Sequence, residues 1–171
     1  MKKTILLTIT LFISGFTGLV HSQDIEEEIK AHARLEYPND YVMQNYVYRN
    51  QMDSYQYMQQ VQNVELEAIA KLEYPNDYVM QEYVYKRQAD ALRYMLNVDD
   101  VELEAIAKLE YPNDYVMQEY VYKRQAASKN FMGGSDVDKE IMKIAVQEYP
   151  NDFTMQQYVY KRQLAARRQL N

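Results

Sequence analysis

The sequence of 171 residues contains no cysteine, which excludes disulfide bonds, thiol chemistry and cysteine-ligated metals. Lipid attachment at a signal-cleavage site is excluded for the same reason, because it requires a cysteine there. Histidine is nearly as scarce: His32 is the only histidine beyond residue 22, so a histidine-based metal site has no second ligand. These absences predict no metal, no cofactor and no catalytic site, and we expect the chain not to be an enzyme.

Long apolar runs are absent except at the N-terminus. Lys2 and Lys3 precede an apolar stretch over residues 5–20, and Val20 and Ser22 supply the small residues of a cleavage site. Residues 1–22 are therefore predicted to be a secretory signal peptide, and the mature chain begins at Gln23. We expect an exported protein, periplasmic or extracellular, with no integral membrane segment after cleavage; an uncleaved anchor is the alternative.

Basic residues are fewer than acidic residues. Removing Lys2 and Lys3 from the 19 basic residues leaves 17 against 25 acidic residues, a formal charge of −8 for the mature chain. Nucleic-acid binding depends on neutralising phosphates with basic side chains. The charge balance therefore predicts no nucleic-acid partner.

Proline occurs four times, always within the motif Tyr-Pro-Asn-Asp, which begins at Tyr37, Tyr74, Tyr111 and Tyr149. The spacings are 37, 37 and 38 residues, and residues 64–89 are identical to residues 101–126. A fixed period of this length is typical of stacked supersecondary units. Four repeats are predicted, over residues 23–63, 64–100, 101–134 and 135–171.

Each repeat is expected to form a helix, a turn and a second helix. Pro75 disfavours helical geometry at Tyr74 and ends the first helix, and Asn76 or Asp77 can cap the second helix near residue 78. A calcium site at the same aspartate is the alternative, but the turn lacks the oxygen-rich loop that such a site needs. The predicted fold class is all-α, with four tandem helix-turn-helix repeats of about 37 residues forming a short helical array or bundle.

Tyrosine is unusually abundant, with 18 copies. Projection of the second helix places Met80, Tyr83 and Val84 on one apolar stripe, which is expected to face the partner helix. A second stripe lies along a separate flank, and its members are Tyr78, Tyr85, Tyr115 and Tyr122. Packing between repeats is the favoured role for these side chains, and a solvent-facing interaction surface is the alternative.

The string Tyr-Pro-Asn-Asp-Tyr-Val-Met-Gln-x-Tyr-Val-Tyr-x-x-Gln covers about fifteen residues of each repeat. It resembles a helical repeat motif of small exported bacterial proteins of unknown function, and the resemblance implies no activity, ligand or partner. The period is similar to that of tetratricopeptide and Sel1-like arrays. The tryptophan, glycine-tyrosine and small-residue positions that define those families are absent.

Near-identical middle repeats favour a non-enzymatic interaction or scaffold module, because added copies extend a surface, whereas an active site needs one asymmetric constellation. Its partner would be a protein or an envelope component that the sequence does not identify. The alternative is an envelope structural or stress protein without a specific ligand. A carboxylate-based hydrolase with a cleft between repeats is a remote alternative.

Overall fold

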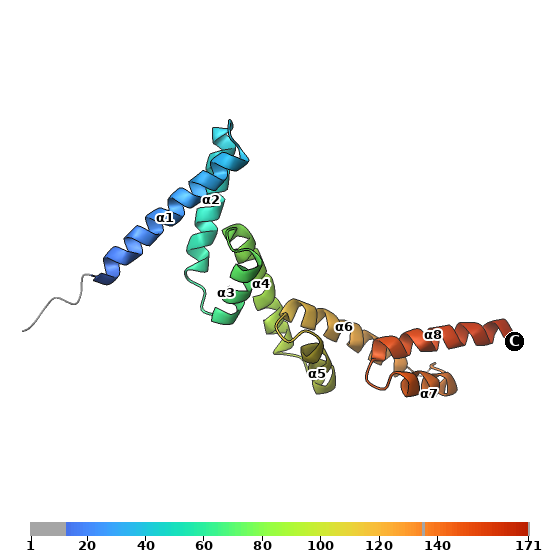
Figure 1. Ribbon diagram of the computed structural model, residues 1–171. Helices are drawn as coiled ribbons and strands as arrows, with labels where there is room; N and C mark the ends of the chain where they lie inside the picture. Colours follow the sequence, from blue (N-terminus) through green and yellow to red (C-terminus); the bar gives the residue numbers. More distant parts are fainter. Residues whose placement is uncertain (1–12, 135, 171) are drawn as a thin grey trace, which may run out of the picture. The chain divides into compact units, whose positions relative to one another are not determined.

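The computed structural model of the protein describes residues 13–134 and 136–170, and the side chains from Asp24 onward within them. This part of the chain forms eight α-helices and no β-strand (Figure 1). In chain order they are α1 (Ile13–Glu36), α2 (Tyr41–Met58), α3 (Val64–Glu73), α4 (Tyr78–Met95), α5 (Val101–Glu110), α6 (Tyr115–Met132), α7 (Lys139–Glu148) and α8 (Phe153–Leu170). The predicted all-α fold class is confirmed.

The helices alternate in length. The first helices α3, α5 and α7 have 10 residues each, and the second helices α2, α4, α6 and α8 have 18. The first helix of the chain, α1, is longer, with 24 residues, and the predicted cleavage site before Gln23 lies inside it. Residues 1–12 of the predicted signal peptide lie outside the described residues. None of the described helices is long and apolar enough to span a bilayer.

Aspartate starts each second helix, as the sequence predicts. The carboxylate Oδ1 of Asp77 accepts a hydrogen bond of 3.1 Å from the backbone amide of Met80. Asp40, Asp114 and Asp152 each accept the same hydrogen bond from the backbone amide of the residue three positions later. These carboxylates satisfy amides that have no partner within the helix, which confirms the predicted capping role.

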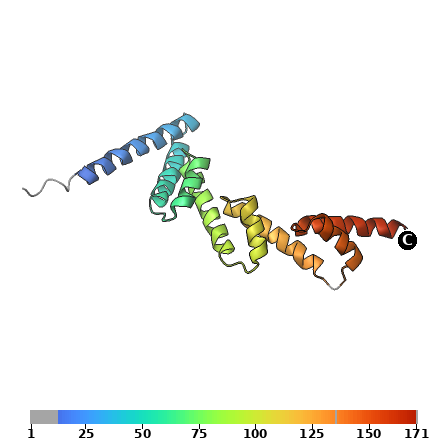
Figure 2. The ribbon, with the colours of Figure 1, turned by 60° about the horizontal axis from the view of Figure 1, so that its bottom comes forward.

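The chain divides into two compact units, residues 1–85 and 86–171, with the boundary inside α4. Unit 1 holds a core of Met58, Ala70 and Val84, against which Tyr57 and Tyr85 pack. Unit 2 holds two cores of matching composition. One consists of Met95, Leu103, Ala107, Val121 and Tyr122, and the other of Met132, Ile141, Ala145, Val159 and Tyr160. Figure 2 shows the ribbon of the helices from a second side.

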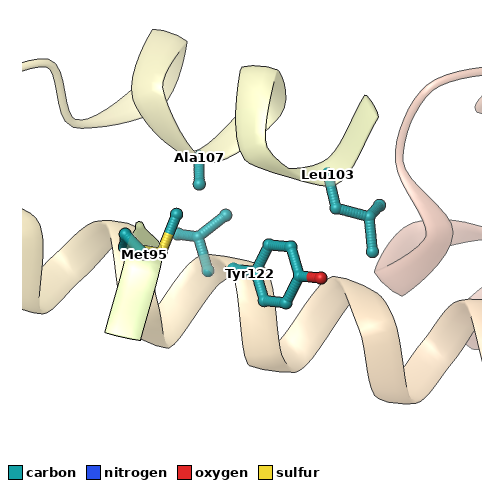
Figure 3. Packing of buried hydrophobic residues seen from close by; sticks show 5 residues of the cluster. Met95, Leu103, Ala107 and Tyr122 are labelled. Carbon is teal, nitrogen blue, oxygen red and sulfur yellow. The ribbon is translucent and has the colours of Figure 1, made fainter. Parts of the chain in front are cut away.

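Each of these cores combines side chains of two successive repeats. In the core around Ala107, Leu103 comes from α5 and Tyr122 from α6, whereas Met95 is the last residue of the preceding second helix (Figure 3). Met58 and Met132 have the same place in the other two cores. The methionine that completes a core therefore always comes from the repeat before it, and a single repeat cannot bury its own apolar face.

Candidate functional site

The four tyrosines of the second stripe do not form an exposed row. Tyr122 is buried, with 9% of its surface exposed, and Tyr78, Tyr85 and Tyr115 are half-buried. Burial raises the pKa of the Tyr78 hydroxyl above its usual value. This flank packs against the preceding repeat and does not face solvent.

Edge-to-face aromatic pairs show how that flank is covered. The ring centroids of Tyr55 and Tyr78 lie 5.1 Å apart, and those of Tyr57 and Tyr85 lie 6.3 Å apart. In unit 2 the corresponding pairs are Tyr94 with Tyr122 at 6.1 Å and Phe131 with Tyr160 at 5.8 Å. Each pair joins the second helices of adjacent repeats, so these tyrosines stabilise the array rather than remaining available to a ligand.

The tyrosine at the neighbouring position is exposed in each repeat. Tyr83, which the sequence placed in the core, is 51% exposed, and Tyr120 and Tyr158 are 54% and 51% exposed. In unit 2 the guanidinium of Arg124 lies 5.5 Å from the ring centre of Tyr120, and that of Arg162 lies 5.6 Å from the ring centre of Tyr158. The exposed flank therefore carries cation–π pairs in successive repeats.

The projection misplaces Tyr83 because two buried glutamines lie on the apolar face of α4, and two more lie on that of α6. In α4 the buried positions are Gln81, Val84, Gln88, Ala91 and Met95. A projection that assigns glutamine to the surface moves the inferred apolar face toward Tyr83 and away from the true one. Glutamine recurs at both positions in all four repeats, which is the one signal in the sequence that these residues have a structural role.

The first glutamine closes the turn within its own repeat. Its amide nitrogen donates a hydrogen bond to the carbonyl of the tyrosine that ends the first helix: Gln81 to Tyr74 at 2.6 Å and Gln118 to Tyr111 at 2.6 Å. Gln44 and Gln156 make the same contact with Tyr37 and Tyr149. The bond satisfies a carbonyl at a helix end that has no partner within the helix.

The second glutamine links one repeat to the next, in a contact that we name the glutamine joint. The amide nitrogen of Gln51 donates to Oδ1 of Asp77 at 2.9 Å, and its amide oxygen accepts from the backbone amide of Tyr78 at 2.8 Å. Gln88 makes the same two hydrogen bonds, donating to Asp114 at 3.0 Å and accepting from the backbone amide of Tyr115 at 2.9 Å. Gln125 donates a hydrogen bond to Asp152 at 3.0 Å and accepts one from the backbone amide of Thr154 at 3.2 Å. Each joint therefore completes the cap of the next second helix from outside that helix.

A different surface is left uncovered on the short first helices. In α3, Val64, Ala68 and Leu72 lie opposite the buried Leu66 and Ala70, and Val64 and Leu72 are 75% and 87% exposed. In α5, Val101 and Leu109 are 74% and 87% exposed. We name these residues the outward faces of α3 and α5; they are Val64, Ala68, Leu72, Val101, Ala105 and Leu109.

The corresponding positions of α7 are polar, since Lys139, Lys143 and Gln147 stand there. The first repeat carries Glu27, Ala31 and Leu35 at these positions, and Leu35 is 81% exposed. The apolar outward face is therefore complete in the middle repeats, partial in the first and absent from the fourth, and it is not a requirement of the fold. Exposed apolar side chains that recur on one helix face are typical of a surface that contacts another molecule. Single exposed leucines would need no such explanation.

Nothing in the described part of the chain brings together three histidine or acidic side chains that could hold a metal ion. His32 is exposed on α1. Comparison of the chain with protein-family models, with curated proteins and with solved structures finds no match.

Proposed function

We propose that the chain is an exported, non-enzymatic interaction or scaffold module that binds a protein or envelope component through the outward faces of α3 and α5. The observation that carries the proposal is the exposure of 87% at both Leu72 and Leu109, on helices whose opposite face is already used for the core. A helix with apolar residues on two faces and a partner on only one leaves apolar surface in water. Covering a valine or leucine side chain contributes about 1.5–3 kcal/mol, so a partner that covers either outward face gains appreciable binding energy.

The contrast with α7 supports this assignment. A chain selected only for solubility would carry polar residues at all equivalent positions, as α7 does with Lys139, Lys143 and Gln147. An envelope structural protein without a ligand, the alternative function, does not require Leu72 and Leu109 to be apolar. The outward faces therefore favour the interaction module.

The double variant Leu72→Gln, Leu109→Gln tests the proposal, because it introduces the residue that the fourth repeat carries at this position. Both side chains are exposed, so we expect the melting temperature to stay within a few degrees. We expect the amount of protein captured from envelope extract by the immobilised chain to fall sharply. The matched control is Glu73→Gln, Glu110→Gln, which changes the adjacent exposed residues and should capture as the wild type does. Equal capture by the two double variants would exclude the outward faces as the binding surface.

Export is tested separately. Intact-mass measurement on the protein from its native host should give a chain that begins at Gln23, recovered outside the cytoplasm. Recovery of a soluble cytosolic chain that still carries residues 1–22 would contradict the export half of the proposal.

A further inference from the structure

Every joint between repeats uses three positions near the end of a second helix. The first is the glutamine of the joint, and Gln51, Gln88 and Gln125 are 7%, 6% and 2% exposed. The second is a small residue, Ser54, Ala91 or Ser128, which is 6%, 1% or 3% exposed. The third is the last residue of the helix, Met58, Met95 or Met132, which is 1%, 3% or 3% exposed. These nine side chains are buried because the next repeat covers them.

The helix α8 carries the same three positions, and no described residue covers them. They are Gln163, Ala166 and Leu170, and all three are exposed, Leu170 to 86%. We name these three residues the tail. Glutamine, a small residue and a large apolar residue are thus present in a second helix where no described repeat packs on them.

The first repeat carries the surface that a tail would cover. Tyr41 and Val42, at the start of α2, are 81% and 79% exposed, whereas Tyr78 is half-buried and Val79 is 38% exposed under the preceding repeat. A cavity of about 290 Å³ lies beside them, with Ala33, Gln44 and Tyr48 among its lining residues. We name Tyr41, Val42, the Asp40 cap and this cavity the head.

The cavity of the head corresponds to the place of a joint methionine. Ala70 belongs to the core that Met58 completes, and Tyr85 packs against that core; their equivalents in the first repeat are Ala33 and Tyr48. Among the described residues, the hydrogen bonds to the Asp40 carboxylate come from Val42 and Met43 of its own helix, at 3.1 and 3.0 Å. The carboxylates of Asp77, Asp114 and Asp152 each accept a further bond from a joint glutamine.

The regions around the two ends carry opposite net charge, although Lys30 and Arg34 line the cavity of the head itself. The tail helix α8 carries Lys161, Arg162, Arg167 and Arg168 and no acidic residue. Over residues 24–40 the first repeat carries six acidic residues against Lys30 and Arg34. Attraction between the ends favours their encounter and disfavours contact of head with head or tail with tail.

We infer that copies of this chain associate head to tail, with Gln163 of one copy forming a glutamine joint with Asp40 of the next. In that joint the amide nitrogen of Gln163 donates to the Asp40 carboxylate, and its amide oxygen accepts from the backbone amide of Tyr41. Leu170 enters the cavity beside Ala33, as Met58 does beside Ala70. Because head and tail are different surfaces, the contact is heterologous, and the head of each copy binds the tail of another.

This intermolecular joint is weaker than the joints within the chain. Arg167 and Gln169 stand where Tyr55 and Tyr57 place rings against the next repeat, so the aromatic pairs are not reproduced. Joints within the chain also benefit from the high effective concentration of covalently linked repeats, which two separate copies lack. Association is therefore concentration-dependent and most extensive at low ionic strength.

Sedimentation velocity of the chain from Gln23 onward, over a range of protein concentrations, tests the inference. The wild type should show a series of oligomers that lengthens with concentration. Gln163→Glu places a carboxylate against Asp40, and Tyr41→Ala removes the exposed ring; each should weaken association by about tenfold or more without lowering the melting temperature. The matched controls are Gln147→Glu in α7 and Tyr46→Ala in α2, which change exposed residues outside the tail and head and should associate as the wild type does.

A mixture of the two interface variants distinguishes this geometry from any other self-association. Gln163→Glu retains an intact head and Tyr41→Ala an intact tail, so the mixture should form heterodimers with wild-type affinity and stop there. A wild type that stays monomeric up to millimolar concentration overturns the inference. Oligomers that both interface variants leave unchanged overturn it as well, and neither result depends on the proposed partner of the outward faces.

Discussion

Glutamine has an uncommon role in this chain, because two glutamines per repeat occupy positions that apolar residues fill in most helical arrays. Gln81 and Gln118 are each 1% exposed. Their amide groups are buried where they satisfy backbone groups at helix ends, at distances near 2.6 Å. Removing one partner of such a bond leaves a buried polar group unsatisfied, which costs more than the bond contributes.

Gln88 and Gln163 provide a matched pair for testing this role. Gln88→Ala removes a buried joint glutamine and leaves the Tyr115 amide without that acceptor, so we expect a loss of about 1–3 kcal/mol in the free energy of unfolding. Gln163→Ala removes the equivalent but exposed side chain and should change it by less than about 0.5 kcal/mol. Urea unfolding measures both free energies, at a protein concentration low enough that the copies do not associate. Equal effects would show that the joint contributes no stability.

Asp100 is the second residue whose environment can be measured directly. The Lys129 ammonium, 2.8 Å from the Asp100 carboxylate, lowers the pKa of that carboxyl, and hydrogen bonds from backbone amides lower it further. A carboxyl with a lowered pKa contributes stability above its unfolded pKa of about 4, and that contribution is lost as the pH falls through the folded value. Lys129→Ala should move the pKa of Asp100 upward, toward its usual value, in an NMR titration. An unchanged pKa would show that the ion pair does not persist in solution.

At the scale of residues, capping was predictable from the sequence and buried glutamine was not. Asp77 follows a proline break and precedes an apolar periodic segment, which is a local pattern with a local cause. The burial of Gln88 depends on contacts with Asp114 and Tyr115, 26 and 27 residues away. Helical periodicity within one segment contains no information about such contacts.

At the scale of helices, the rotation of each second helix is the feature that decides which side chains are available. In α6, Val121 is 1% exposed and Tyr120 is 54% exposed, although the two residues are adjacent in the chain. The position of the helix is fixed by Gln118 and Gln125 as much as by apolar residues. The sequence predicted the ends of the helices well and their rotation poorly, because ends depend on local turn residues and rotation depends on tertiary contacts.

Tyr122 and Tyr120 test that rotation on one helix. Tyr122→Ala removes a ring from a core that includes Leu103 and Ala107, so we expect a loss of about 3–5 kcal/mol in the free energy of unfolding. Tyr120→Ala should lower it by less than about 1 kcal/mol, since the ring is largely in water. Chemical denaturation of the two variants gives the comparison. The reverse order of effects would mean that the flank with Tyr122 faces solvent and the flank with Tyr120 is buried.

At the scale of the whole molecule, stability is distributed over the joints. The contacts that hold a repeat in place come from the adjacent repeats, as the cores around Ala70, Ala107 and Ala145 show. This arrangement explains how near-identical repeats can be added without a new core, because each copy supplies a methionine to the next and receives one from the previous copy. The number of repeats was readable from the sequence, whereas the sharing of cores required the structure.

A repeat of this protein is stable only when its neighbours complete its core and its caps. Circular dichroism of an isolated second repeat, residues 64–97, compared with the intact chain, tests it most directly. The fragment lacks Met58 and Gln51, and a first helix of 10 residues is marginal alone, so we predict much lower helix content per residue and no cooperative melting transition. A fragment that melts cooperatively at the same temperature as the intact chain would contradict the claim, and the protein would then be a series of independently stable helical hairpins.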